Sequence, residues 1–427
     1  MGDAPAIPLS PEDKAILDLE CSWIAGHTCK LVALGPDAPG VAELRELIAG
    51  RIAGVPELTR KLGGTAGAPL WVPDADFDPA RHVRESPAGR PPDRTAEMDE
   101  IARLFGERLD RDRPLWAIDV VPRAGGGTVL VWRIHHALAD GTASMRFAEE
   151  LLWDADLQAG GGPSRPAGTG SLSHLAEHPD EARRRGHLAA FVEREFAGSL
   201  HRSPFDGRVG ERRRIAVGEV PLGALHDAAR ELAGATLNDA VLAVVAGSLR
   251  RWIERHHGPL GDVRARVPVS LHREGDDAGN RDSFFSVRLP LGAGDPVERL
   301  RVVAGETRVR KREHDAERIE GLAAGIGRHS AKLAALVERI ESSPREFAVN
   351  VSNVPGPRHR VSVLGAPVKS LHSIAEIGLR HGLRITAVSL ADRLYFGFNA
   401  DPALVPEVEW LAEGVEIEAG ELIGLAS

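Results

Sequence analysis

A segment rich in Gly, Pro and Ser, residues 156–175 (DLQAGGGPSRPAGTGSLSHL), divides the chain into two stretches of comparable size. Core elements of secondary structure do not tolerate these residues at such a density, because they favour a flexible, solvated backbone. On both sides of the segment, β-rich runs alternate with helical apolar spacing. We therefore expect an α/β protein with an N-terminal domain over residues 1–155 and a C-terminal domain over residues 206–427, joined by a linker and crossover over 156–205. Two halves of this kind predict a cleft at their interface.

The N-terminal half begins with a clear helix signal. Ser10 precedes Pro11, and acidic residues follow in the first turn, which is the pattern of a capped helix start. Two β-rich runs are joined through the sequence PRAGGG, which predicts a strand–loop–strand pair. The expected elements are a helix over 43–53, strands over 116–121 and 128–134, and a helix after Gly141.

The C-terminal half repeats the alternation of helix and strand without repeating the sequence. Its helical stretches carry apolar residues at helical spacing, and its β-rich runs are short. The expected helices cover 237–252 and 296–314, and the expected strands cover 266–271, 346–351, 384–391 and 393–398.

Composition excludes several classes of protein. A chain of 427 residues with 43% hydrophobic and 27% charged residues can bury a core without disulfides or metals. The formal net charge of -9 argues against nucleic acid as the main partner. Cys21 and Cys29 lack zinc-ligand spacing and are too few for a disulfide framework. No apolar N-terminal segment resembles a signal peptide, and the apolar run 240–246 is short for a membrane span. We expect a soluble cytoplasmic protein, which could still sit peripherally on a membrane or a lipid inclusion.

The stretch WRIHHALADGTAS, residues 132–144, places His135 and His136 at the end of an apolar run. Successive side chains of a strand point to opposite faces, so the two imidazoles should meet different environments. A metal site needs several converging ligands, and no second ligand cluster accompanies this stretch. We therefore predict no metal here.

Acid–base chemistry is the alternative that this stretch favours. One imidazole, held at the end of a rigid strand, could accept the proton of an alcohol, thiol or amine while that group attacks an activated carbonyl. Asp140 would form an ion pair or shape the turn, and Gly141 would tolerate a positive φ there. The plain alternative is that both histidines are ordinary polar residues at a strand end.

The stretch HHxxxDG at residues 135–141 resembles the signature of the CoA-dependent acyltransferase superfamily. Further motifs in one order along the chain narrow the resemblance to the bacterial wax ester synthase/diacylglycerol acyltransferase family. They are an N-terminal helix ending at Glu20, Pro114-Leu115-Trp116, Asn238-Asp239, the segment from PVS at 268–270 to Gly279-Asn280, and SNVPGP at 352–357. Together they cover nearly the whole chain.

This resemblance implies a fold of two chloramphenicol-acetyltransferase-like domains, with mixed sheets flanked by helices and a tunnel at their interface. It assigns the general base to His136 and a mainly structural role to Asp140, within the candidate catalytic group His135, His136, Asp140 and Gly141. It also implies a ternary complex in which an acceptor hydroxyl attacks the thioester directly. Acyl-CoA is then a co-substrate, and no other cofactor is expected.

The same motifs supply candidate substrate-binding residues, namely Glu20, Trp116, Asn238, Asp239, Ser352 and Asn353. Three of them, Asn238, Ser352 and Asn353, could donate hydrogen bonds to the tetrahedral oxyanion. Each has a structural alternative: Asn238 as a helix N-cap, and Ser352 and Asn353 as turn residues before Pro355.

One position departs from the family pattern. His272 stands where the family usually has an arginine that could pair with Asp140. Arg266 or Arg273 could take over this pairing, or Asp140 is paired differently.

Three functions are compatible with the sequence. The first is an acyl-CoA-dependent O-acyltransferase that makes triacylglycerol from diacylglycerol, wax ester from fatty alcohol, or both. The second is an acyltransferase of specialised metabolism that acts on a polyketide, sugar or peptide hydroxyl. The third is a non-catalytic binding or scaffold protein of the same fold.

Overall fold

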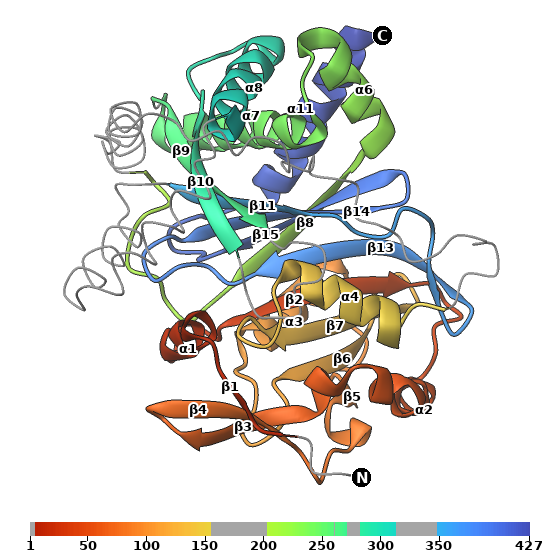
Figure 1. Cartoon of the computed structure of the whole chain (residues 1–427). Helices are drawn as coiled ribbons and strands as arrows, with labels where there is room; N and C mark the ends of the chain where they lie inside the picture. Colours follow the sequence, from red (N-terminus) through yellow and green to blue (C-terminus); the bar gives the residue numbers. More distant parts are fainter. Residues whose placement is uncertain (1–4, 155–202, 260, 271–281, 313–347) are drawn as a thin grey trace.

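The computed structural model describes residues 5–154, 203–259, 261–270, 282–312 and 348–427, and Figure 1 shows their arrangement. The described residues form two six-stranded sheets, one above the other in the view, and a three-stranded sheet at the foot of the molecule. The Gly/Pro/Ser-rich segment 156–175 lies outside the described residues.

The lower six-stranded sheet has the strand order β12-β13-β2-β7-β6-β5. All its neighbouring strands pair antiparallel except β5 with β6. The predicted strand–loop–strand pair is confirmed as β6 and β7. The strands are β2 (His27–Leu34), β5 (Val83–Glu85), β6 (Trp116–Pro122), β7 (Thr128–His135), β12 (Ser362–Val363) and β13 (Ala366–Ala375).

The upper sheet has the order β10-β9-β11-β14-β15-β8. Here β11 runs parallel to both of its neighbours, and the remaining pairs are antiparallel, so the sheet is mixed. The strands are β8 (Arg214–Pro221), β9 (Val263–Ser270), β10 (Asp282–Leu289), β11 (Val349–Val354), β14 (Leu383–Leu390) and β15 (Arg393–Ala400).

Helices flank both sheets, as expected for mixed α/β halves. Four helices cover the upper sheet from above, and their buried faces join its hydrophobic core (Figure 1). They are α6 (Leu222–Ala233), α7 (Leu237–His257), α8 (Pro296–Arg312) and α11 (Glu409–Ala426). The lower sheet is accompanied by α1 (Pro11–Asp18), α2 (Val41–Arg51), α3 (Arg94–Gly106) and α4 (Gly141–Leu151). The small sheet consists of β1 (Ile7–Pro8), β3 (Arg60–Thr65) and β4 (Ala68–Pro73).

Strand alternation splits the core of the N-terminal half. On β7, Leu130 and Trp132 are buried among residues of α4, whereas Val129 and Val131 are buried among residues of α3. The lower sheet therefore has a hydrophobic layer on each face, which fits the nearly continuous apolar run of β7.

The two sheets are connected through β13, which comes from the C-terminal part of the chain and pairs with β2. Its backbone also contacts the upper sheet. The Ser373 carbonyl accepts a hydrogen bond from the Thr386 hydroxyl, and the Ala375 carbonyl accepts one from Asn399 Nδ2 at 2.9 Å. The sequence does not predict a strand at this position.

Most of the remaining element predictions agree with the structure within a few residues. Ser10 caps α1 as expected, accepting a hydrogen bond from the Asp13 N–H at 3.0 Å. The strand expected over 346–351 is instead β11, which begins at Val349 and continues to Val354.

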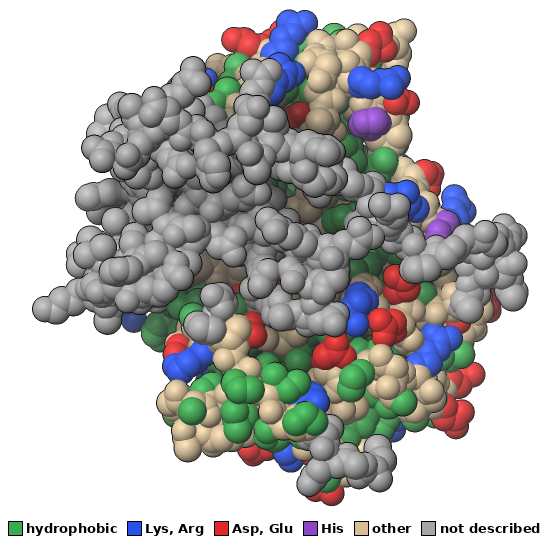
Figure 2. Space-filling model, in the orientation of Figure 1, with side chains coloured by type: hydrophobic (Ala, Val, Ile, Leu, Met, Phe, Trp, Pro, Cys, Tyr) green, Lys and Arg blue, Asp and Glu red, His purple; other side chains and the backbone are tan. Residues whose placement is uncertain are grey.

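In the described part of the chain, no single helix has the length and apolar composition of a membrane span. Among the described helices, one pair, α6 and α7, satisfies these criteria together, and it is bent by 92°. On the face shown in Figure 2, hydrophobic side chains gather over β1, β3 and β4. Ile7 of β1 is 46% exposed.

Candidate active site

The two histidines occupy the point where β7 ends and the chain turns towards α4. The backbone N–H of His135 donates to the Leu115 carbonyl, and that of His136 donates to the Gly26 carbonyl, both at 2.9 Å. The His135 carbonyl in turn accepts the N–H groups of Leu138 and Ala139. Backbone hydrogen bonds alone therefore hold this turn to Leu115, to Gly26 and to its own following residues.

The two imidazoles lie in different environments, as strand alternation predicted. His135 is fully buried, and its Nδ1 accepts the N–H of Ala137 at 3.1 Å. Its Nε2 lies 2.8 Å from Glu20 Oε1. Because Nδ1 accepts a hydrogen bond, the proton of the neutral ring must be on Nε2, where it faces the carboxylate. Both nitrogens of His135 are thus engaged.

Glu20 is held ionised by its surroundings. Burial alone would raise its pKa, but hydrogen bonds from His135 and Arg108, with the charge of Arg111, outweigh burial and lower the pKa to about 2. Arg108 Nη2 and Arg111 Nε each donate to Glu20 Oε2 at 2.9 Å. The structure therefore places Glu20 against His135.

His136 is half-buried, and its Nδ1 is buried. Burial, with the charge of Arg384 acting in the same direction, lowers the pKa of this imidazole to about 4. The charge of Asp140 opposes both effects. At neutral pH the ring is uncharged, which is the state in which an imidazole accepts a proton.

Asp140 is the N-cap of α4. It is buried, and its Oδ1 accepts the Ala143 N–H at 2.7 Å. Its charge also helps to keep the buried Lys30 protonated, although burial lowers the pKa of Lys30 to about 8. Asp140 therefore shapes the turn, as the sequence predicted.

Gly141 corrects one expectation, because its φ is not in the left-handed region. Glycine is needed here for a different reason: a Cβ at this position would stand 2.9 Å from Val354 Cγ2. The close approach brings the last residue of β11 against the first residue of α4. The SNVPGP segment and the HHxxxDG segment therefore meet in space.

Ser352 and Asn353 lie in β11 itself, so their expected place in a turn is wrong. They pair with Thr386 and Ala387 of β14. Ser352 is buried and Asn353 is half-buried, and they lie two residues and one residue before Val354, respectively. Their assignment as substrate-binding residues remains a prediction.

Asn238 is not the N-cap of α7, which is Thr236. Asn238 lies in the first helical turn and is half-buried. The neighbouring Asp239 is buried and holds the helix start: its Oδ2 accepts the Thr236 N–H at 2.8 Å, and its Oδ1 accepts the Thr307 hydroxyl at 2.6 Å. The contacts of Asp239 are structural, and a role in substrate binding stays a prediction for both residues.

Trp116 is buried in the core beneath the site. Its indole Nε1 donates to the Leu58 carbonyl at 2.8 Å, and its ring stacks on His82 with centroids 4.4 Å apart. Its neighbour Leu115 accepts the His135 N–H. The geometry therefore connects Trp116 to the site through the backbone of its neighbour.

Sequence reasoning missed a second carboxylate near the histidine turn. It binds Ala25, the residue before Gly26, whose carbonyl accepts the His136 N–H. Glu376 follows β13, and its Oε2 accepts the Ala25 N–H at 2.9 Å. Its Oε1 accepts Arg213 Nε at 3.1 Å, and Arg213 also donates to the Trp23 carbonyl. Glu376 lies 351 positions from Ala25 in the chain. No local motif marks it, so only the folded structure reveals it.

Several predicted positions cannot be placed. His272, Arg273, Gly279 and Asn280 lie outside the described residues. Arg266 on β9 pairs with Asn350 on β11, and Asn350 pairs on its other side with Arg384 on β14. Among the described residues, no group of three or more His, Cys, Asp or Glu could hold a metal ion.

Comparison with known sequences gives two matches to family models. The model of the wax ester synthase/diacylglycerol acyltransferase catalytic domain matches residues 9–168, and that of the corresponding C-terminal domain matches residues 278–422. A probable diacylglycerol O-acyltransferase of Mycobacterium tuberculosis, tgs1, is 31% identical over 389 residues. That alignment covers 84% of this chain and 82% of the relative.

Comparison with solved structures gives the same fold. A wax ester synthase/diacylglycerol acyltransferase from Marinobacter aquaeolei VT8 superposes with a TM-score of 0.72 at 22% identity, covering 98% of this chain and 99% of that one. A starter condensation domain of rhizomide synthetase, solved with C8-CoA, gives a TM-score of 0.58 at 15% identity over 99% and 93% of the two chains. The two-domain mixed α/β architecture is therefore shared.

Proposed function

This chain belongs to the wax ester synthase/diacylglycerol acyltransferase family, and we propose that it acylates the hydroxyl of diacylglycerol or a fatty alcohol with His136 as the general base. It is an acyl-CoA-dependent O-acyltransferase, so the non-catalytic alternative is set aside. The observation that carries the role of His136 is the different state of the two imidazoles. His135 is engaged at both nitrogens, whereas His136 is neutral and partly exposed.

The proposed reaction needs one proton acceptor that later returns its proton. As the acceptor oxygen attacks the thioester carbonyl carbon, His136 Nε2 takes the hydroxyl proton, because a free alcohol is a poor nucleophile at neutral pH. The tetrahedral oxyanion then collapses, the carbon–sulfur bond breaks, and the CoA thiolate takes the proton from His136. The products are an ester and CoA thiol, and no acyl-enzyme forms.

The low pKa of His136 has two opposite effects on the proposed proton transfer. It keeps the ring unprotonated and ready, but a weakly basic imidazole accepts a proton less readily. The nearby charge of Asp140 stabilises the imidazolium once it forms. The negative charge that develops on the tetrahedral intermediate would act in the same direction.

We propose that His135 is a positioning residue rather than a second base. Its Nδ1 anchors the Ala137 N–H, and Glu20 anchors its Nε2. Both bonds fix the turn that carries His136. Asn238, Ser352 and Asn353 are proposed as polar groups near the oxyanion.

The test is thiol release from palmitoyl-CoA with dioleoylglycerol, with hexadecanol or without acceptor. His136→Ala should lower the acceptor-dependent rate by about 100-fold or more, the usual contribution of a general base. His226→Ala, an exposed histidine on α6, is the matched control and should leave the rate unchanged. Full activity in His136→Ala would overturn the assigned base. Release with neither lipid acceptor would favour the acyltransferase of specialised metabolism.

His135→Gln separates positioning from proton transfer. The amide of glutamine can replace one hydrogen bond, so we expect a smaller loss of kcat than in His136→Ala and an unchanged KM for palmitoyl-CoA. The acid limb of the pH–rate profile should persist in His135→Gln, because His136 still titrates. An acid limb that disappears with His135 would assign the base to that residue instead.

We also propose a peripheral contact with lipid surfaces, because the acceptors named here reside in them. The hydrophobic side chains over β1, β3 and β4, including the exposed Ile7, support this placement. Co-flotation with phosphatidylcholine vesicles that contain dioleoylglycerol should be weaker for Ile7→Asp than for the control Ala49→Asp on α2. Equal flotation of the two variants would move the contact elsewhere.

A further inference from the structure

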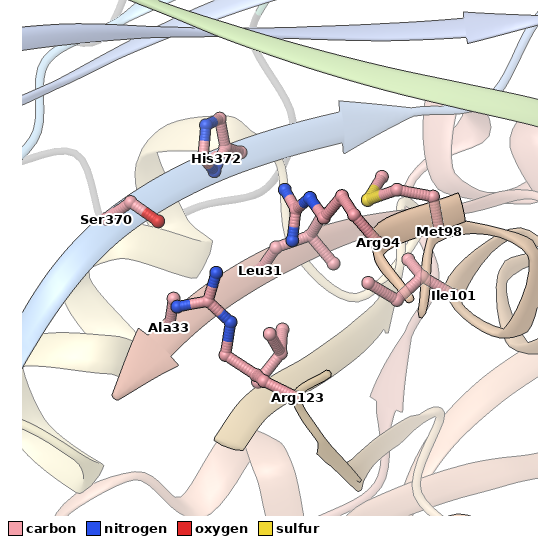
Figure 3. A pocket seen from close by; sticks show the side chains of 9 residues that line it. Leu31, Ala33, Arg94, Met98, Ile101, Arg123, Ser370 and His372 are labelled. Carbon is pink, nitrogen blue, oxygen red and sulfur yellow. The ribbon is translucent and has the colours of Figure 1, made fainter. Parts of the chain in front are cut away.

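A pocket lies on the α3 side of the lower sheet, well away from the histidine turn. It lies between α3 and β13, over β2 and the start of β7, and Figure 3 shows the side chains that line it. Val129, one of its lining residues, is six positions along β7 from His135, which is roughly 20 Å at the usual strand rise. The pocket is therefore out of reach of the atoms that react at His136.

Two cations reach this pocket from different elements. Arg94 extends from the first turn of α3, and Arg123 extends from the end of β6 (Figure 3). Both form ion pairs with Oε1 of the buried Glu97, Arg123 Nε at 3.6 Å and Arg94 Nη1 closer still. Two guanidinium groups share one carboxylate, so the group keeps one formal positive charge beside the pocket.

The β13 side of the pocket is polar. Ser370 and His372 line it, and His372 is only 7% exposed. The imidazole packs edge-on against Tyr395 with centroids 5.1 Å apart. Within the described residues, neither ring nitrogen of His372 has a hydrogen-bond partner. The ring nitrogens are therefore satisfied by solvent or by a ligand in the pocket.

The positive charge beside the pocket affects the pKa of His372. Burial lowers the pKa of this imidazole to about 3, and the charges of Arg94 and Arg123 act in the same direction. The ring is therefore neutral and keeps one N–H that can be donated. A neutral donor, a hydroxyl and two guanidinium groups around one pocket form a set of hydrogen-bond donors that suits a negatively charged oxygen.

We propose that this pocket binds a small oxyanion, a carboxylate or phosphate group, at Arg94, Arg123, Ser370 and His372. The guanidinium groups would bind its oxygens directly, and His372 would donate its N–H. The rest of the lining includes the apolar side chains of Leu31, Met98 and Ile101. The site is distant from the reacting atoms, so its ligand would bind there without taking part in bond making or breaking.

The experiment is calorimetric titration of the purified full-length chain with inorganic phosphate, hexanoate and uncharged hexanol. We expect saturable one-to-one binding of at least one of the anions and none of hexanol. Tighter binding of hexanoate would identify a carboxylate on an apolar stem, and tighter binding of phosphate would identify a phosphate group. Failure of both anions to bind, or binding of hexanol as tight as that of hexanoate, would overturn the proposal.

Variants locate the binding. Arg123→Met and Arg94→Met should each weaken the anion by about tenfold or more, the usual effect of losing a hydrogen bond to a charged group. Arg81→Met, an exposed arginine of the segment Pro79–Arg81 that does not line the pocket, is the matched control. His372→Phe keeps the ring shape and removes the donor, and should weaken binding several-fold. Equal affinities in Arg123→Met and Arg81→Met would refute the site, whether or not His372→Phe folds.

Discussion

Gly141 and Val354 are in such close contact that a Cβ on the glycine would stand 2.9 Å from Val354 Cγ2. The first belongs to the helix that follows His136, and the second ends the β11 strand of the other sheet. Relative movement of the two sheets would therefore change this contact first. The position of the catalytic turn depends on packing between the halves as well as on its own hydrogen bonds.

Gly141→Ala tests this dependence. Alanine is the better helix former, so any loss must come from the contact with Val354, where overpacking typically costs about 1–3 kcal/mol. We expect a lower melting temperature and at least about a tenfold loss in kcat/KM. Gly50→Ala in α2, where a Cβ would meet nothing within 4 Å, should leave activity intact. Adding Val354→Ala to Gly141→Ala should restore part of the loss, and simple additivity of the two changes would argue against the contact.

Glu20→Gln should lower stability in a pH-dependent way. The folded protein holds the pKa of Glu20 at about 2, below its ordinary 4.5, so the carboxylate stabilises the fold above pH 4.5. That stabilisation is lost as the pH falls from 4.5 towards 2. Urea unfolding at pH 7 should show a loss of up to about 3 kcal/mol, and the loss should shrink at pH 3. Glu46→Gln, at an exposed position of α2, is the control. The same loss at both pH values would refute this account.

Arg384→Met should move the acid limb of the pH–rate profile upward. In the free enzyme the pKa of His136 is about 4, so kcat/KM should be flat between pH 5.5 and 8. Removing the Arg384 charge raises the pKa towards its ordinary 6.5, while burial still keeps it below that value. Activity of the variant should therefore fall within the range where the wild type is flat. Arg230→Met, an exposed position on α6, should keep the wild-type profile.

The pair formed by Arg213 and Glu376 should show strong energetic coupling. Both side chains are buried, and losing either one leaves the other charge uncompensated. Burial already raises the pKa of Glu376 against the opposing charge of Arg213. A double-mutant cycle of Arg213→Met and Glu376→Gln should give a coupling energy of about 1–3 kcal/mol. The exposed pair Arg146–Glu57 should give less than about 1 kcal/mol, and equal couplings would be evidence against the buried network.

Local sequence patterns predict those elements whose structure depends on residues close together in the chain. The helix start at Ser10 and the antiparallel pair β6–β7 follow from capping and alternation, and both agree with the structure. The separation of His135 from His136 also follows, because it depends only on the period of a strand. These features involve residues that are close together in sequence.

Long-range contacts could not be predicted in this way. Glu20 Oε1 lies against His135 Nε2, and Glu376 accepts a hydrogen bond from Ala25, which is far away in the sequence. A positive φ is expected at Gly141 because such turns often require one. The structure gives another reason for glycine, the close approach of Val354 on β11. Each of these facts depends on which segments meet after folding, and a single sequence contains no local signal for that.

The pairing of β13 with β2 has a consequence for dividing the protein. An isolated N-terminal half would lose β13, and β2 would then become an edge strand with a row of unpaired backbone groups. Such an edge recruits other chains, so the fragment should aggregate. Chimeras between relatives must likewise preserve the register from Ser370 to Ala375 against β2, together with the buried Lys30–Ser373 hydrogen bond. Although a Gly/Pro/Ser-rich segment divides the sequence, the halves are not interchangeable modules.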